Sequence, residues 1–158
     1  MVRLEGRAAA ESAPAFEKLV NRLKDQGVRC VVLDLSGTLL MDSGFSGTLS
    51  RLVASATASF ALYRAPRRIL DSLEDHGVLE QVTLLDSELS PPLPQATTQV
   101  PVESASKPEI LRCCLDAHRA LMALKPENVA KFEAVERFLS REAQKLDSNP
   151  VQPHTDQG

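Results

Sequence analysis

The sequence predicts an α/β protein, with a small, mostly parallel sheet and helices followed by a C-terminal helical pair. Over residues 1–86, short apolar runs alternate with segments of helical periodicity. Residues 87–107 are rich in proline, which predicts an extended linker. Amphipathic segments at 108–146 then predict a helical hairpin, and residues 147–158 are expected to form a disordered tail.

The chain is expected to begin with a brief strand at residues 2–4 and an amphipathic helix. The helix is predicted from apolar side chains at i, i+3, i+4 and i+7, namely Phe16, Leu19, Val20 and Leu23. Ser12 is a candidate N-cap, Pro14 falls in the first turn, and Gly27 is expected to end the helix.

Residues 28–35 are nearly continuously apolar, which is typical of a parallel strand that is covered on both faces. The following helix is predicted from apolar residues at helical spacing: Phe45, Leu49, Leu52, Val53 and Ala56. Asp42 or Ser43 is expected to cap it, because a side-chain oxygen at that position accepts hydrogen bonds from the free amides of the first turn.

A strand at 60–63 and a strand at 82–85 complete the predicted sheet. Between them, Pro66 is expected to open a helix and Gly77 to close it, since proline suits the first helical turn and glycine the residue after the last.

Each helix of the C-terminal pair has an apolar stripe. The first stripe consists of Leu111, Cys114, Leu115, His118, Leu121 and Met122. The second helix, opened by Pro126, has a stripe of Val129, Phe132, Val135, Phe138 and Leu139. Because such stripes are unfavourable in water, the two helices are expected to pack on each other and on the sheet domain or a partner.

Composition narrows the classes of function. A net charge of −3 and a 4% aromatic content disfavour binding to nucleic acid or an anionic membrane. No apolar run approaches the roughly 18 residues that a membrane span needs. Three cysteines, Cys30, Cys113 and Cys114, without a C-x-x-C pair favour a reduced, cytoplasmic setting. No cofactor is expected.

One short motif suggests an enzyme. Residues 34–39, Asp-Leu-Ser-Gly-Thr-Leu, are within one residue of the D-x-D-G-T-L signature of haloacid-dehalogenase-type phosphotransferases, in which the first Asp is the nucleophile. Ser36 replaces the second carboxylate and cannot donate a proton as a carboxylic acid does. The later acidic residues Asp71, Asp75 and Asp86 lack the spacing of a magnesium-binding pair. Catalysis is not expected, and a phosphotransferase using Asp34 remains an alternative.

Two other groups of residues could form sites. Cys114 and His118 have an i, i+4 spacing that can chelate a metal, but two ligands are not a site and core packing is favoured. Arg64, Arg67 and Arg68 could contact a phosphate or an acidic partner, although a solvated helix start is the favoured interpretation. No metal site is predicted.

The stretch VVLDLSGTLLMDSGFSGTL, residues 31–49, resembles the STAS domain, the fold shared by bacterial anti-sigma factor antagonists and sulphate-transporter tails. It is similar to the family's strand, loop and helix with the pattern hydrophobic-Asp-Leu-Ser followed by Asp-Ser-[Ser/Thr]-x-x-Gly-x-Leu. Residues 62–85 are similar to its next strand, a helix ending in glycine, and its closing strand. The family normally opens with two strands, so a first strand is expected to be lost, to precede the given start, or to be replaced by another chain at the exposed edge.

The resemblance implies a non-catalytic bacterial regulator that acts in signal transduction and transcription by binding a protein partner. The partner would be an anti-sigma factor with serine-kinase activity or a component of a sensor complex. The implied binding surface is the loop and helix start at residues 40–48, with site residues Asp42, Ser43, Gly44, Phe45, Ser46 and Thr48. A scaffold that binds through its C-terminal helices is a further alternative.

Phosphorylation is where this sequence departs from the family. The family's acceptor is the hydroxyl residue directly after Asp-Ser, and here that position is Gly44, which has no hydroxyl. The protein is therefore not expected to be switched by phosphorylation. Ser43 or Ser46 could substitute as acceptors, but Ser43 is favoured as a helix cap and Ser46 as a solvent-exposed residue of the first turn.

Overall fold

The computed structural model describes residues 1–55, 59–85 and 104–148. Within them the chain forms a four-stranded, all-parallel sheet and five α-helices, so the predicted α/β class with a C-terminal helical pair is confirmed. The elements are β1 (Val2–Ala8), α1 (Ala13–Asp25), β2 (Cys30–Met41), α2 (Ser43–Ala54), β3 (Ser59–Tyr63), α3 (Arg67–Asp75), the 3-10 helix η1 (Leu79–Gln81), β4 (Thr83–Leu85), α4 (Lys107–Leu124) and α5 (Pro126–Ser148).

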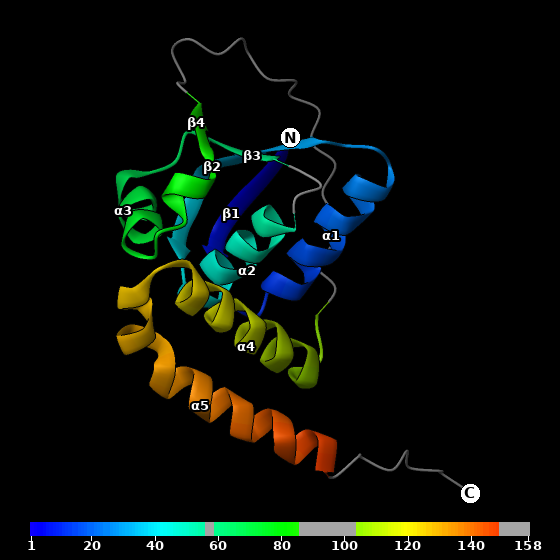
Figure 1. Cartoon of the computed structure of the whole chain (residues 1–158). Helices are drawn as coiled ribbons and strands as arrows, with labels where there is room; N and C mark the ends of the chain where they lie inside the picture. The colour runs from blue at the N-terminus through cyan, green and yellow to red at the C-terminus, as the bar shows by residue number, and fades with distance from the viewer. Residues whose placement is uncertain (56–58, 86–103, 149–158) are drawn as a thin grey trace, which may run out of the picture.

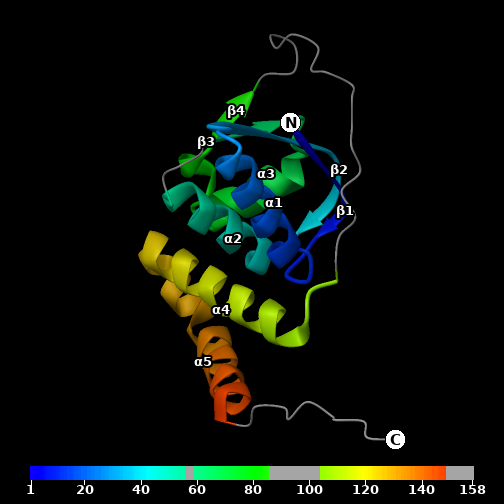
Figure 2. The same ribbon diagram turned by 90° about the vertical axis from the view of Figure 1, so that its right-hand side faces the viewer.

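The strands follow the order β1-β2-β3-β4, so β1 and β4 are the two edges of the sheet. Parallel neighbours are joined by right-handed crossovers, and a sheet whose strands stay in sequence order therefore receives all its crossover helices on one face. Figures 1 and 2 show α1, α2 and α3 on the same side of the sheet. The fold is a sheet layer, a layer of three helices and the α4–α5 hairpin beyond them.

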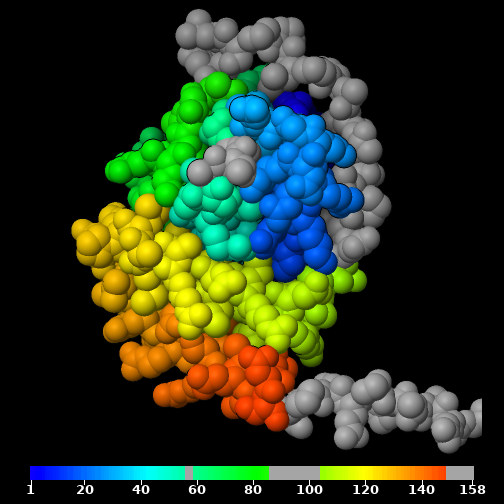
Figure 3. Space-filling view, turned by 45° about the vertical axis from the view of Figure 1, so that its right-hand side comes forward, coloured from blue at the N-terminus to red at the C-terminus, as the bar shows by residue number. Residues whose placement is uncertain are grey.

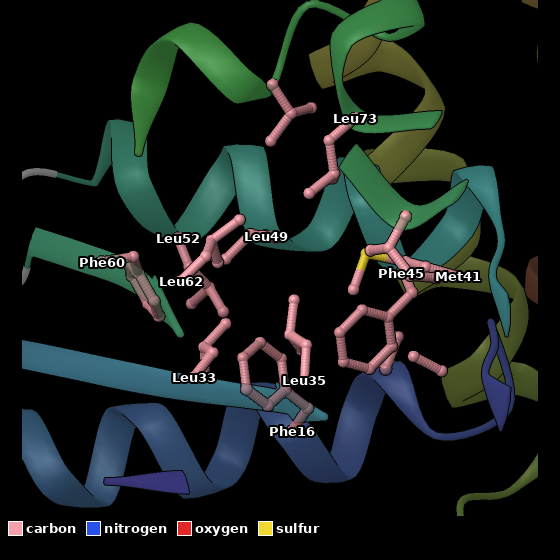
Figure 4. Close-up of a cluster of buried hydrophobic side chains, with 14 of the residues drawn as sticks. Phe16, Leu33, Leu35, Met41, Phe45, Leu49, Leu52, Phe60, Leu62 and Leu73 are labelled. Atoms are coloured by element: carbon pink, nitrogen blue, oxygen red, sulfur yellow. The ribbon is translucent and has the colours of Figure 1, made fainter. Parts of the chain in front are cut away.

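The main core lies between the sheet and these three helices (Figure 4). The strands contribute Leu33, Leu35, Phe60 and Leu62; the helices contribute Phe16, Phe45, Leu49 and Leu73. The rings of Phe16 and Phe45 lie 4.9 Å apart between centroids, which joins α1 to α2. Burial of such side chains is worth roughly 1.5–3 kcal/mol each and holds the layers together.

Strand lengths differ from the sequence prediction. β1 has seven residues where a brief strand at 2–4 was expected, and β2 continues to Met41 instead of ending at residue 35. Register shifts between β1 and β2 allow the two strands to remain paired along this length. The expectation that residues 28–35 are covered on both faces is wrong, because on the face opposite the helices Cys30 is exposed and Val32 only half-buried.

Asp34 connects the two strands on the face opposite the helices. Its Oδ2 accepts a hydrogen bond from Arg3 Nε at 2.9 Å, and its Oδ1 accepts one from Ser36 N at 3.0 Å. The carboxylate is only 1% exposed. Burial raises its pKa, but the hydrogen bonds from Ser36 and Arg3 outweigh burial and leave the pKa of Asp34 lowered. Asp34 therefore stabilises the fold as an ion.

Helix ends follow the predicted signals in most places. Pro14 lies in the first turn of α1, Pro66 precedes α3, and Gly27 and Gly77 terminate helices with φ of 85° and 78°. Ser12 does not cap α1 with its side chain; its hydroxyl donates instead to Ala9 O at 2.8 Å.

The C-terminal helices pack on each other and on the sheet domain, as predicted, but α4 buries two faces instead of one. Because α4 lies between α2 and α5, its residues Cys113 and Ala117 are buried in addition to members of the predicted stripe such as Leu121. On α5, Phe132 and Leu139 face inward, whereas the other three residues of the predicted stripe are exposed: Val129, Val135 and Phe138.

The predicted linker and tail fall largely outside the described residues. Residues 87–103 of the linker are not described, and its last residues form the start of α4, where Ser106 and Glu109 make a reciprocal capping box. Of the predicted tail, residues 147–148 belong to α5, and residues 149–158 lie outside the description.

Asp34→Asn should destabilise the fold by about 1–3 kcal/mol, since it removes the charge from a buried acceptor of two hydrogen bonds. Unfolding in urea measures the effect. Because the pKa of Asp34 is lowered in the folded state, the wild type should lose this contribution as the pH falls below about 4, the usual range of an aspartate, and the variant should not. Equal stability of the two proteins at pH 7 would contradict the structural role.

Candidate functional site

Asp42 fixes the start of α2, the first part of the predicted binding surface. Its Oδ1 accepts a hydrogen bond from Phe45 N at 2.8 Å, as an N-cap does, and its Oδ2 accepts one from Ala10 N at 2.9 Å. Of the two predicted caps, Asp42 is the one that caps the helix. The same carboxylate thus holds the chain after β1 against the end of β2.

Most of the predicted surface at residues 40–48 is covered by the protein itself. Figure 3 shows α4 packed against the α1 and α2 side of the molecule, with α5 beyond it. Leu40 is 44% exposed, and Ser43 is half-buried. Phe45 points into the main core, and Gly44 and Thr48 are buried. The expectation that Ser46 faces solvent is wrong, because Ser46 is 0% exposed.

Gly47 brings the backbones of α2 and α4 together. A Cβ at this position would overlap the backbone carbonyl of Ala117 and lie 2.8 Å from its Cβ. Only glycine fits here without moving α4. The space around Gly44 is also small, but a Cβ there would lie 2.9 Å from the Cβ of Ala10, which does not belong to α4 or α5. The two glycines therefore accommodate different neighbours.

Polar contacts cross the interface between α2 and α4 on both sides of Gly47. Ser43 Oγ lies 3.0 Å from His118 Nε2, and His118 Nδ1 lies 2.7 Å from the carbonyl oxygen of Cys114. A carbonyl can only accept, so Nδ1 carries a proton; in the neutral ring Nε2 then accepts from the Ser43 hydroxyl. Thr48 Oγ1 donates to Gly44 O at 2.9 Å and lies 3.5 Å from Cys113 Sγ.

Two histidines and Phe132 meet where α3, α4 and α5 converge. The rings of His76 and His118 make edge contacts with Phe132, at centroid distances of 5.6 and 5.2 Å. Buried Asn128 donates through Nδ2 to His76 O at 2.9 Å and to Leu121 O at 2.8 Å. The start of α5 is therefore tied to both α3 and α4 by specific hydrogen bonds.

Burial lowers the pKa of His76 below its usual value. Neighbouring Asp75 opposes this shift and Lys131 adds to it, and these two side chains form an ion pair at 2.6 Å. The folded protein thus favours a neutral imidazole at His76.

The residues considered for metal or anion binding have other partners. The Nδ1 atom of His118 contacts the backbone carbonyl oxygen of Cys114. Burial raises the pKa of the Cys114 thiol to about 11, which disfavours the thiolate that binds metals. The described residues contain no group of three or more His, Cys, Asp or Glu that could hold a metal ion.

The three arginines around Pro66 do not converge. Arg64 lies over the Tyr63 ring at 5.0 Å, Arg67 pairs with Asp71 within its own helix, and Arg68 donates to Thr38 O at 3.1 Å. Each has a structural contact, so they do not form a common anion site.

Asp34 lies within β2 with both oxygens accepting hydrogen bonds, which is unfavourable for a nucleophile. Of the later acidic residues, Asp71 pairs with Arg67 and Asp75 with Lys131, and Asp86 lies outside the described residues. These contacts favour the structural interpretation of Asp34 over the phosphotransferase alternative.

Comparisons with family models, with curated proteins and with solved structures gave no match for this chain. In the part of the chain that the structure describes, no helix is long and apolar enough to cross a membrane.

Sequence reasoning predicted Ser43 and Thr48 as site residues but did not connect them to α4. Gly47, Cys113 and Ala117 lie outside the apolar stripes, and the Ser43–His118 contact spans 75 residues of sequence. One local signal was present. Ser43, Gly47 and Ser50 give α2 a small-residue face at helical spacing, and such a face permits close approach of another helix.

Gly47→Ala should lower the free energy that holds α4 against α2 by about 1–3 kcal/mol, since an added methyl group overpacks the contact with Ala117. Modification of Cys113, which is buried in this interface, by a thiol reagent should accelerate roughly tenfold or more. Gly44→Ala is the matched control because its methyl group meets Ala10 instead of the hairpin. Equal labelling rates in the two variants would contradict the assigned role of Gly47.

Acidification should destabilise the protein through His76. The pKa of His76 is lowered on folding, so its contribution is present above the unfolded pKa of about 6.5 and is lost as the pH falls below it. Urea unfolding at pH 7.5 and pH 5.5 should show a smaller loss of stability in His76→Gln than in the wild type. An identical pH dependence of both proteins would rule out this contribution.

Proposed function

We propose that this chain is a non-catalytic regulatory binding protein of the STAS type, which binds a protein partner through the β2–α2 loop and the N-terminal half of α2. One observation carries the proposal: this face of α2 already binds a helix, α4, through a close contact at Gly47 and polar contacts at Ser43 and Thr48. A surface that accepts one helix has the shape and hydrogen-bonding groups to accept another.

The sequence resemblance points to the same surface. The Asp-Ser pair that resembles the family motif stands at the start of α2, with Asp42 as its cap and Ser43 directed to His118. The partner class that the resemblance implies is an anti-sigma factor or a sensor-complex component. Three free cysteines suit a reduced compartment, so we place the function in the cytoplasm.

Control by phosphorylation is not part of the proposal. Gly44 has no hydroxyl, Ser46 is fully buried, and the Ser43 hydroxyl is engaged by His118 while α4 is in place. A kinase needs an accessible hydroxyl, so regulation would act through partner abundance or through access to α2.

A scaffold that binds through α5 is the second candidate. It is favoured by Phe138, which is 61% exposed, and by the neighbouring exposed Val135. Aromatic residues such as phenylalanine are enriched at protein–protein interfaces.

Photo-crosslinking in the native cell distinguishes the two surfaces. A benzophenone amino acid replaces Leu40, Phe138 or Leu84 in the full chain, and all three positions are exposed in the wild type. A specific protein adduct at Leu40, but not at Leu84 on the sheet edge, is the expected result. An adduct confined to Phe138 would favour the scaffold, and the absence of a specific adduct at Leu40 would contradict the proposal.

A further inference from the structure

We infer that α4 is a displaceable, built-in occupant of the α2 face, and that this face binds amphipathic helices with α4-like chemistry. Such a helix has an acidic residue in its first turn and, two turns later, a small residue followed by a hydrogen-bond acceptor. The inference rests on the proposed function where it identifies the partner's binding element, whereas release of α4 is a property of this chain by itself.

The main core is largely complete without the hairpin. Among the buried members of the cluster between sheet and helices, only Cys113, Leu121 and Phe132 come from α4 and α5. Leu115 and Leu139 are also buried but do not belong to that cluster. Releasing the hairpin therefore leaves the sheet and its three helices with most of their apolar contacts.

The remaining contacts exchange readily with water or with another helix. The ion pairs Lys18–Glu109 and Lys131–Asp75 lie at the surface, where solvent screening leaves such pairs with little net stabilisation. A hydrogen bond such as Ser43–His118 likewise contributes a small net amount, because water replaces it on release. These surface contacts thus resemble those of a transient protein interface, and release of the whole hairpin also breaks the hydrogen bond from buried Asn128 to His76 O.

The chemistry of a matching helix follows from what α4 presents. Gly47 requires a small residue opposite it, and α4 supplies Ala117. The next residue, His118, accepts from Ser43, and Glu109, about two turns earlier, pairs with Lys18 of α1. A glycine, alanine or serine at the central position would fit, whereas leucine would overlap α2.

The covalent connection makes α4 a strong competitor. A tethered segment has an effective concentration on the order of millimolar, so an external helix must bind well or be abundant to replace it. Fixing α4 in place should therefore close the surface, and freeing it should open the surface.

Thr48 and Cys113 offer a reversible lock for the test. Their Oγ1 and Sγ atoms lie 3.5 Å apart, so Thr48→Cys places two sulfur atoms within reach of a disulfide. The full chain with Thr48→Cys, Cys30→Ser and Cys114→Ser is compared oxidised and reduced. The probe is a fluorescent peptide of residues 104–125 with Cys113→Ser and Cys114→Ser, so that it cannot form a disulfide itself, and its binding is followed by anisotropy. Replacing Cys113 with Ser in the same chain gives a matched control that cannot form the lock.

Saturable binding to the reduced chain, weakened at least tenfold by oxidation, is the expected result, with no change in the control. A peptide carrying Ala117→Leu should not bind. Equal binding to the oxidised and reduced chains, or no binding to either, would overturn the inference. If the peptide exchanges as expected but no protein crosslinks at Leu40, release of α4 is supported and the proposed function fails.

Discussion

The close approach of α4 to α2 at Gly47 determines how the C-terminal part of the chain is placed. Without a side chain at this position, the backbone of α4 lies directly against α2, and Ala117 packs in the space that a Cβ would fill. This approach brings His118 to Ser43 and Cys113 to Thr48. It also brings His118 against Phe132 of α5, whose start is held separately by the hydrogen bonds of Asn128 to His76 O and Leu121 O.

The sheet domain supplies a fixed platform for this contact. Arg3 and Asp34 join β1 to β2 on one face, and the apolar cluster joins both strands to the helices on the other. Asp42 then links the end of β2, the chain after β1 and the first turn of α2 through two hydrogen bonds. The start of α2 is therefore well ordered by contacts that do not involve the hairpin, which suits a surface that exchanges its occupant.

Local signals in the sequence predicted the class of fold and most of its elements. Prolines and glycines at helix ends, such as Pro126 and Gly77, act within a few residues and can be recognised without the fold. The length of β2 could not be predicted this way, because its last residues pair with β1 through register shifts that only the folded sheet defines. The placement of the helices on one face of the sheet could not be predicted either, because it follows from the strand order of the folded sheet.

The candidate site was predicted in position but not in environment. Asp42 and Ser43 stand at the start of α2 as the motif suggested, yet burial of Ser46 and Thr48 depends on packing that is distant in the sequence. The same limit explains α4 and α5. An amphipathic pattern assumes one buried face, whereas α4 lies between two helices, and Phe138 falls on the flank of α5 that no described helix covers.

Native-state hydrogen exchange tests the central claim, that α4 leaves α2 without unfolding the sheet domain. Amide exchange along α4 and β2 is followed in low concentrations of denaturant, which separates local opening from global unfolding. The account predicts that the amides of α4 open at a lower free energy than those of β2, with a distinct dependence on denaturant. A single opening free energy shared by α4 and β2 would show that the hairpin unfolds only with the whole protein, and would contradict the account.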